Sequence, residues 1–216
     1  MGPVTAHLDQ PALDLATALD RARRLAARPA RSILGITGPP GCGKSTLAAA
    51  ISSELGQDCV LVPMDGFHLA DVALEELGLR GRKGAPETFD SWGYAALLGR
   101  LRADAGPVVY APAFERGLEQ PIAGSIAMPA GTALVITEGN YLLHDGAAWA
   151  AARECLDEIW YCDVDDETRL RRLTARHVQF GKTRAAAAAW VAAVDEPNAR
   201  LIAATRQAAH ALVTLE

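Results

Sequence analysis

Apolar residues follow two different spacings along the chain, and together these predict alternating helices and strands. From Leu13 to Ala27 they recur every three or four positions, which predicts an amphipathic helix that ends at Arg28-Pro29. Ser32 to Thr37 is instead a short and almost wholly apolar run, and the alanine-rich segment Ser45 to Leu55 follows it. We therefore expect a strand, a glycine-rich turn and a helix in this part of the chain.

Further short apolar runs repeat this alternation along the rest of the sequence. The predicted strands are Cys59 to Pro63, Val108 to Ala111, Thr132 to Thr137, Glu158 to Val164 and a short last one at Leu212 to Leu215. The predicted helices include Tyr94 to Asp104, Glu167 to Val178, Arg184 to Val194 and Asn198 to Ala209. Apolar strands that alternate with helices are typical of an α/β fold, in which helices cover both faces of a parallel sheet. Without an internal repeat or a linker, we expect a single domain over residues 1–216, with an N-terminal helix within residues 1–30.

One long segment has neither spacing. Leu77 to Trp92 is rich in charge, glycine and proline. A loop of this length in a compact domain is usually functional or disordered. Phe89 and Trp92 give the segment apolar surface to bury, which favours a functional loop.

Composition and charge exclude several classes of protein. The chain has 216 residues, of which 50% are hydrophobic and 22% charged, as in an ordinary folded protein. The net charge is −5, and basic residues gather only in short clusters (Arg21 to Arg31, Arg80 to Lys83 and Arg169 to Arg184) that are equally typical of solvated faces. We therefore expect no nucleic-acid partner.

No run of apolar residues approaches the roughly 18 residues of a membrane span, and the N-terminal segment lacks the apolar core of a secretion signal. We expect a cytoplasmic protein without a membrane partner.

The cysteines give no sign of a metal site. Cys42, Cys59, Cys155 and Cys162 form no CxxC pair and have no histidine at metal-ligand spacing. We expect reduced thiols without a catalytic role.

The turn after the first predicted strand matches the phosphate-binding pattern GxxxxGK[ST] in full, as Gly38-Pro39-Pro40-Gly41-Cys42-Gly43-Lys44-Ser45. Glycines let backbone amides face phosphate groups, and the start of the following helix attracts the anion. Lys44 is expected to reach the terminal phosphates and Ser45 to bind Mg²⁺. The alternative is a glycine-rich turn with a surface lysine. The predicted nucleotide contacts are Gly38, Pro39, Gly41, Cys42, Gly43, Lys44, Ser45 and Thr46.

Two carboxylates follow apolar strands, where ligands bind in open parallel sheets. Asp65 comes after the second predicted strand and Glu138 after the fourth. Phosphoryl transfer to an alcohol uses a carboxylate that accepts the hydroxyl proton and acidic groups that hold Mg²⁺. Asp65 suits the first role and Glu138 the second. The alternatives are a turn-capping aspartate and a salt-bridged glutamate. His68 is either an acceptor contact or a packing residue.

A basic helix follows the fifth strand. Arg169, Arg172 and Arg176 have the spacing that places them along one helix face. Such arginines can stabilise charge on a transferring phosphoryl group, and Arg176 is our candidate. We expect residues 166–195 to form a helical lid with a hinge at residues 180–183. The alternative is an exposed face paired with the neighbouring acidic residues.

Taken together, MDGFHL, RKGAPETFD, YAPAFERGLEQPIAG and ITEGNYLL resemble the nucleoside/nucleotide kinase-like family of the phosphoribulokinase, uridine kinase and pantothenate kinase superfamily. Some members of that family are named as candidate fructose-transport kinases. The resemblance covers roughly Ser32 to the C-terminus. It implies a three-layer P-loop NTPase fold, ATP and Mg²⁺ as cofactors, Asp65 as the base and Glu138 on the metal side. It also points to Phe89, Asp90, Tyr110 and Arg116 as acceptor contacts, and Asp90 matches the residue that holds ribose hydroxyls in nucleoside kinases. With Asp65, His68 and Lys83, these residues make up the predicted acceptor pocket.

The sequence departs from the uridine kinase pattern after Tyr110. The histidine that reads a pyrimidine is missing, and Arg116 would suit an anionic acceptor. The alternative for Tyr110 and Phe114 is a place in the apolar core.

We expect a kinase for a nucleoside-, sugar- or pantothenate-like alcohol, with a homodimer left open. The other readings are a nucleotide-dependent switch, for which Asp90 to Gly93 spells DxxG without a guanine-reading [NT]KxD, and a nucleotide-binding module without chemistry.

Overall fold

The computed structural model describes residues 12–103 and 108–215, and its centre is a five-stranded parallel sheet. Its strands lie in the order β2-β5-β1-β6-β7. They are β1 (Ser32–Thr37), β2 (Cys59–Leu61), β5 (Leu134–Glu138), β6 (Glu158–Asp163) and β7 (Ala211–Thr214). This confirms the predicted α/β fold, and it places β1 between β5 and β6 at the centre of the sheet.

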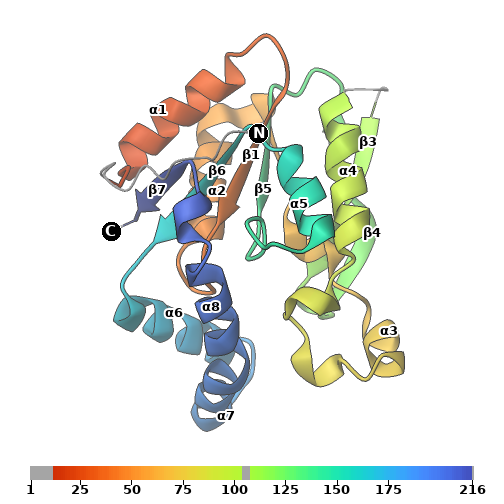
Figure 1. The fold of residues 1–216 in the computed structure, drawn as a ribbon, viewed down its shortest axis with the longest axis vertical. Coiled ribbons are helices and arrows are strands. Elements are labelled where there is room, and N and C mark those ends of the chain that lie inside the picture. Colours follow the sequence, from red (N-terminus) through yellow and green to blue (C-terminus); the bar gives the residue numbers. More distant parts are fainter. Residues whose placement is uncertain (1–11, 104–107, 216) are drawn as a thin grey trace.

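Helices cover both faces of this sheet, as Figure 1 shows. On one face, α1 (Leu15–Ala26) and α2 (Lys44–Leu55) pack in one apolar cluster with alternate residues of β1 such as Leu34 and Ile36. On the other face, α4 (Ser91–Ala103) and α5 (Ala147–Glu154) pack in a second cluster with Ile33. All six residues of β1 are buried, which explains why the strand is apolar without alternation.

The third predicted strand does not belong to the parallel sheet. Val108–Glu115 (β3) pairs antiparallel with β4 (Gln120–Pro129), and the two form a separate sheet. The apolar run at Val108 suggested a strand that is buried on both faces. In the structure its residues alternate instead, because Val108 and Tyr110 are 40% and 59% exposed while Val109 and Ala111 are buried. Only one face of the hairpin therefore packs on the protein. The strand β4 was not predicted, and the end of the predicted helix at Asp104 lies outside the described residues.

The predicted lid is helical. It contains α6 (Asp166–Gln179), α7 (Arg184–Trp190) and a π-helical turn (Val191–Asp195), and α8 (Glu196–Ala203) follows. In Figure 1, α6 and α7 extend beyond one end of the parallel sheet. The last predicted helix ends at Ala203 rather than Ala209, because a short 3-10 turn leads from there into β7.

The aperiodic segment folds without a long regular element. It follows α3 (Asp71–Glu76) and contains two short 3-10 turns, Arg80–Arg82 and Pro86–Thr88. Phe89 is buried as expected, but Trp92 is 63% exposed, so the prediction that both aromatic residues would be buried is half wrong. Within the described ranges, the helices are too short or too polar to cross a membrane.

Candidate phosphoryl-transfer site

The phosphate-loop motif forms the turn between β1 and α2, and its glycines are required by geometry. Gly38, Gly41 and Gly43 have φ values of 142°, 86° and 104°, a region that other residues rarely adopt. At Gly41 a Cβ atom would also lie 2.8 Å from the carbonyl oxygen of Arg169 in α6. The turn therefore depends on glycine for its conformation and for the close approach of the lid.

Lys44 is buried beneath the loop rather than exposed at a surface turn. It is 9% exposed, and its Nζ donates to the carbonyl oxygens of Gly38 (2.8 Å) and Pro39 (3.2 Å). The ammonium group is thus held across the loop by main-chain acceptors. This contact holds the lysine side chain at the loop.

Ser45 and Glu138 lie together at the carboxyl ends of β1 and β5. The Ser45 hydroxyl donates to Oε1 of Glu138 over 2.9 Å. Burial of Glu138 raises the pKa of its carboxyl group, and the charge of Asp65 adds to this effect, while Lys44 and the Ser45 hydrogen bond oppose it. A hydroxyl and a carboxylate are oxygen ligands of the kind that Mg²⁺ prefers. The pair therefore fits a divalent cation, which would also relieve the unfavourable burial of the glutamate charge.

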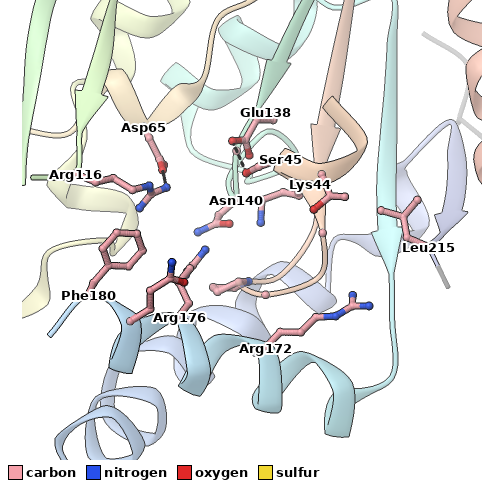
Figure 2. A pocket seen from close by; sticks show the side chains of 16 residues that line it. Lys44, Ser45, Asp65, Arg116, Glu138, Asn140, Arg172, Arg176, Phe180 and Leu215 are labelled. Atoms are coloured by element: carbon pink, nitrogen blue, oxygen red, sulfur yellow. Dashed lines mark hydrogen bonds and ion pairs between the residues drawn. The ribbon is translucent and has the colours of Figure 1, made fainter. Parts of the chain in front are cut away.

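A cavity of about 600 Å³ opens in front of the phosphate loop. Figure 2 shows Lys44, Ser45 and Glu138 on one side of it and the lid residues Arg172, Arg176 and Phe180 on the other. Of the predicted nucleotide contacts, five line this cavity: Gly41, Gly43, Lys44, Ser45 and Thr46. Gly38, Pro39 and Cys42 do not, and the first two act instead through the carbonyl groups that hold Lys44.

Other lining residues were missed, namely Pro40, Gly139, Asn140, Gln179, Phe180 and Leu215. Pro40 is inside the motif, and Asn140 follows Glu138 by two positions, so both carried a signal in the sequence. Leu215 carried none. Its Cδ1 lies 3.1 Å from where a Cβ of Gly43 would stand, a contact that only the return of the chain through β7 creates.

Cys42 points away from the cavity toward Cys162 of β6. Both thiols are buried. Burial alone would raise the pKa of Cys42, but the hydrogen bond with the Cys162 thiol and the charge of Lys44 lower it to about 6. Cys42 is therefore a packing residue beneath the loop whose thiol is polarised by its surroundings, and the four described cysteines form no disulfide.

Asp65 lies in a short 3-10 turn (Met64–Phe67) that follows β2, close to the carboxyl end of that strand. Its carboxylate faces the Arg116 guanidinium, with Oδ2 and Nη2 3.4 Å apart. The two side chains are 32% and 47% exposed, so this ion pair is worth at most about 1 kcal/mol. Asp65 therefore stays available to a ligand.

A second cavity, of about 720 Å³, shares a wall with the first. The residues common to both are Pro40, Asp65, Arg116, Asn140, Arg176 and Phe180. Four of the predicted acceptor contacts besides Asp65 line the second cavity: His68, Lys83, Phe89 and Arg116. Asp65 thus stands between a cavity that contains the phosphate loop and one that contains most of the predicted acceptor residues.

His68 is held in one orientation within the second cavity. Its ring lies 4.1 Å from the Phe89 ring and 4.8 Å from the Phe114 ring, centroid to centroid. Nδ1 lies 2.8 Å from the carbonyl oxygen of Asp65, and because a carbonyl only accepts, Nδ1 carries the proton. Burial lowers the pKa of His68. The ring is therefore neutral near pH 7 and leaves Nε2 as a hydrogen-bond acceptor.

Two predicted acceptor residues are not at either cavity. The carboxylate of Asp90 accepts a hydrogen bond from the Gly93 amide (2.8 Å) and caps the start of α4, and Tyr110 is exposed on β3. The structure contradicts their placement in the acceptor pocket. It also argues against the switch reading of Asp90 to Gly93, because a residue that caps a helix away from the phosphate loop cannot sense a terminal phosphate there.

The three arginines predicted to lie along one face of the basic helix have different surroundings in α6. Arg169 is buried and donates to Glu196 (2.6 Å) and Asp166 (3.0 Å), so it holds the lid together. Arg172 and Arg176 line the first cavity and make no hydrogen bond or ion pair with any described residue. Of the three, Arg172 and Arg176 are therefore free to contact a nucleotide phosphate.

Comparisons with known proteins agree with this geometry. Residues 34–83 match the family model described as ATPase family associated with various cellular activities (AAA). The chain is 35% identical over 184 residues to YggC of Escherichia coli K12, covering 82% of this chain and 76% of YggC. It is 32% identical over 174 residues to C227.14 of Schizosaccharomyces pombe, which is named as a candidate uridine kinase, covering 75% and 73%. The crystal structure of a candidate fructose transport system kinase from Silicibacter sp. TM1040 superposes with a TM-score of 0.80 at 37% identity, covering 92% of this chain and 97% of that one.

Proposed function

The chain belongs to the nucleoside/nucleotide kinase-like family of the phosphoribulokinase, uridine kinase and pantothenate kinase superfamily of P-loop kinases, and from this premise we propose which reaction its site performs. The protein transfers the γ-phosphoryl group of ATP to a hydroxyl group of a small metabolite. The phosphate loop binds the nucleotide in the first cavity, and the acceptor binds in the second.

The position of Asp65 carries this proposal. A phosphoryl donor and an acceptor hydroxyl must meet in line, and the wall that the two cavities share is where they meet. The carboxylate of Asp65 lies on that wall with partial exposure and only a long ion pair to Arg116. It can accept the proton of the attacking hydroxyl as the new bond to phosphorus forms.

The remaining roles follow from charge. Lys44 and the amides of the phosphate loop face the β- and γ-phosphates, and Arg176, which lines both cavities without an ion pair, faces the phosphoryl group as it moves. Ser45 and Glu138 would hold Mg²⁺, which supplies charge neutralisation at the phosphate oxygens when it is bound. Glu138 then serves the metal, and Asp65 is left as the base.

A screen for acceptor-dependent ATP consumption tests the proposal. Purified protein with ATP and Mg²⁺ would be offered sugars, nucleosides and hydroxy acids one by one, and ADP release would be recorded. We expect ADP release above the background rate with at least one compound and stoichiometric formation of a phosphorylated product by mass spectrometry. ADP release that depends on a protein partner, or that is equal with every compound, would instead support a nucleotide-dependent switch.

A further inference from the structure

The second cavity contains more positive charge than its own carboxylates neutralise. Lys83 pairs with Asp71 (2.6 Å), and Arg80 pairs with the same carboxylate (3.2 Å). His177 of the lid holds Asp195 over 2.8 Å. On the cavity wall the carboxylates of Asp71 and Asp195 are therefore already engaged, and Asp65 pairs with Arg116 over 3.4 Å, whereas two cations of the lid have no carboxylate partner among the described residues.

These two cations are Arg176 and Lys182. Neither forms an ion pair with a carboxylate of residues 12–103 or 108–215. The Lys182 ammonium instead lies 4.8 Å from the centroid of the Trp190 ring and is half-buried. An ammonium held over an aromatic ring at a cavity wall keeps its charge and three donors for a ligand.

Arg116 adds a third cation from the opposite side. It belongs to the turn of the β3–β4 hairpin, and its guanidinium lies 5.9 Å from the Phe180 ring at the end of α6. Its one carboxylate partner is Asp65, which the acceptor hydroxyl would engage during transfer. Once Asp65 is engaged in this way, the Arg116 fork is left facing the cavity together with the lid cations.

We propose that the acceptor is an anionic alcohol, which carries a carboxylate or phosphate group in addition to the hydroxyl that receives the phosphoryl group. This inference rests on the proposed function. Arg116 and Lys182 bind the anion from the two sides of the second cavity, and the neutral His68 ring accepts a hydrogen bond from a further hydroxyl. Glu119, the remaining unpaired carboxylate of the wall, is exposed and lies on the hairpin turn. The lid therefore recognises the acceptor as well as the nucleotide.

Matched pairs of compounds test this inference. Each pair has the same hydroxyl groups with and without the anion: glycerate against glycerol and gluconate against glucitol for a carboxylate, and hexose phosphates against the free hexoses for a phosphate. With ATP and Mg²⁺ present, we expect kcat/KM to be about tenfold or more higher for the anionic member of at least one pair. The pair that responds identifies which anion the site takes.

Two variants and a control locate the effect. Lys182→Met keeps apolar contact with Trp190 but removes the charge, and Arg116→Lys removes the planar fork. Both are expected to raise KM for the anionic acceptor about tenfold while KM for ATP stays unchanged. Arg184→Met removes an exposed lid charge that lies at neither cavity and is expected to change neither constant.

Failure of the inference can be told apart from failure of the proposed function. If kcat/KM for the neutral alcohol equals that for its anionic counterpart in every pair, the inference is wrong while the kinase assignment stands. If no compound increases ADP release, the kinase assignment fails, and thermal shifts with the same pairs decide the rest. Stabilisation by anionic members alone, lost in Lys182→Met and kept in Arg184→Met, would support an anion site, and equal shifts within every pair would overturn it.

Discussion

The two cavities that meet at Asp65 differ in how complete they are. On the phosphate-loop side the polar groups are bonded to one another, because Lys44 is buried and bonded to two carbonyl groups and Ser45 is bonded to Glu138. On the acceptor side, Lys182 lies over an aromatic ring and Arg116 makes a long, exposed ion pair. Polar groups that already hold one another in place lose little freedom when a ligand binds, whereas a cation with a weak partner or none gains most from an added anion. On the proposed function, the nucleotide would therefore meet side chains that are bonded to one another, and the acceptor would meet cations with weak partners or none.

The largest effect is expected for Lys44→Ala in the phosphate loop. Loss of the ammonium removes charge stabilisation at the transferring phosphoryl group, so we expect a fall in kcat of about 10³-fold or more. Acceptor-dependent ADP release measures this, and the melting temperature serves as the control, because Gly38 and Pro39 lose their partner. Unchanged turnover in a folded variant would contradict the assignment of the loop.

Asp65→Asn tests the proposed base on the wall that the two cavities share. An amide cannot accept the hydroxyl proton, so kcat should fall by about 10²–10⁴-fold with little change in nucleotide affinity. Product formation at fixed times would measure kcat, and a nucleotide titration would measure the affinity for ATP. Asp145→Asn, at an exposed carboxylate that lines neither cavity, is the matched control. A loss of ATP affinity equal to the loss of rate would place Asp65 on the nucleotide side.

Glu138→Gln separates metal binding from folding. We expect the Mg²⁺ concentration needed for half-maximal turnover to rise by about tenfold or more. Because the pKa of Glu138 is raised in the folded protein, its contribution to stability is present at low pH and is lost as pH rises through that raised pKa. Without Mg²⁺ the variant should therefore melt at a higher temperature than the parent at neutral pH and lose less stability between mildly acidic and neutral pH. An identical pH dependence of the melting temperature in both proteins would show that burial does not raise the pKa of Glu138.

The smallest effect is expected for Asp90→Ala, which tests whether Asp90 caps α4 or contacts the acceptor. The structure places Asp90 at the start of α4, so the variant should lose about 1 kcal/mol of unfolding free energy. KM for the acceptor should stay the same, in contrast to the tenfold rise expected for Arg116→Lys. Denaturant unfolding and acceptor titration measure the two. A rise in KM without a loss of stability would return Asp90 to the pocket.

Short-range patterns in the sequence were enough to find the nucleotide side. The phosphate loop is contiguous from Gly38 to Ser45, so its motif encodes its chemistry directly. Asp65 and Glu138 come from distant segments, yet both follow apolar strands. Because the carboxyl ends of parallel strands share one edge of the sheet, their proximity was predictable too.

The hairpin and the start of α4 show why other predictions failed. Apolar runs indicate burial but not the partner strand, so Val108 to Ala111 was assigned to the parallel sheet although it pairs with β4. Asp90 has the same sequence signature as a ligand-binding aspartate and as a helix cap. Only the position of the Gly93 amide distinguishes the two roles.

The sequence by itself determined the fold class, the phosphate loop and the two strand-end carboxylates, because each depends on local spacing or on the direction of a strand. The tertiary structure decided that Lys44 is buried, that Asp90 and Tyr110 lie away from the cavities, and that Lys182 and Leu215 lie on their walls. These facts depend on how the lid, the hairpin and the last strand pack around the sheet. Contacts between segments far apart in the chain leave no periodic signal in either segment, so packing alone sets which of their side chains meet.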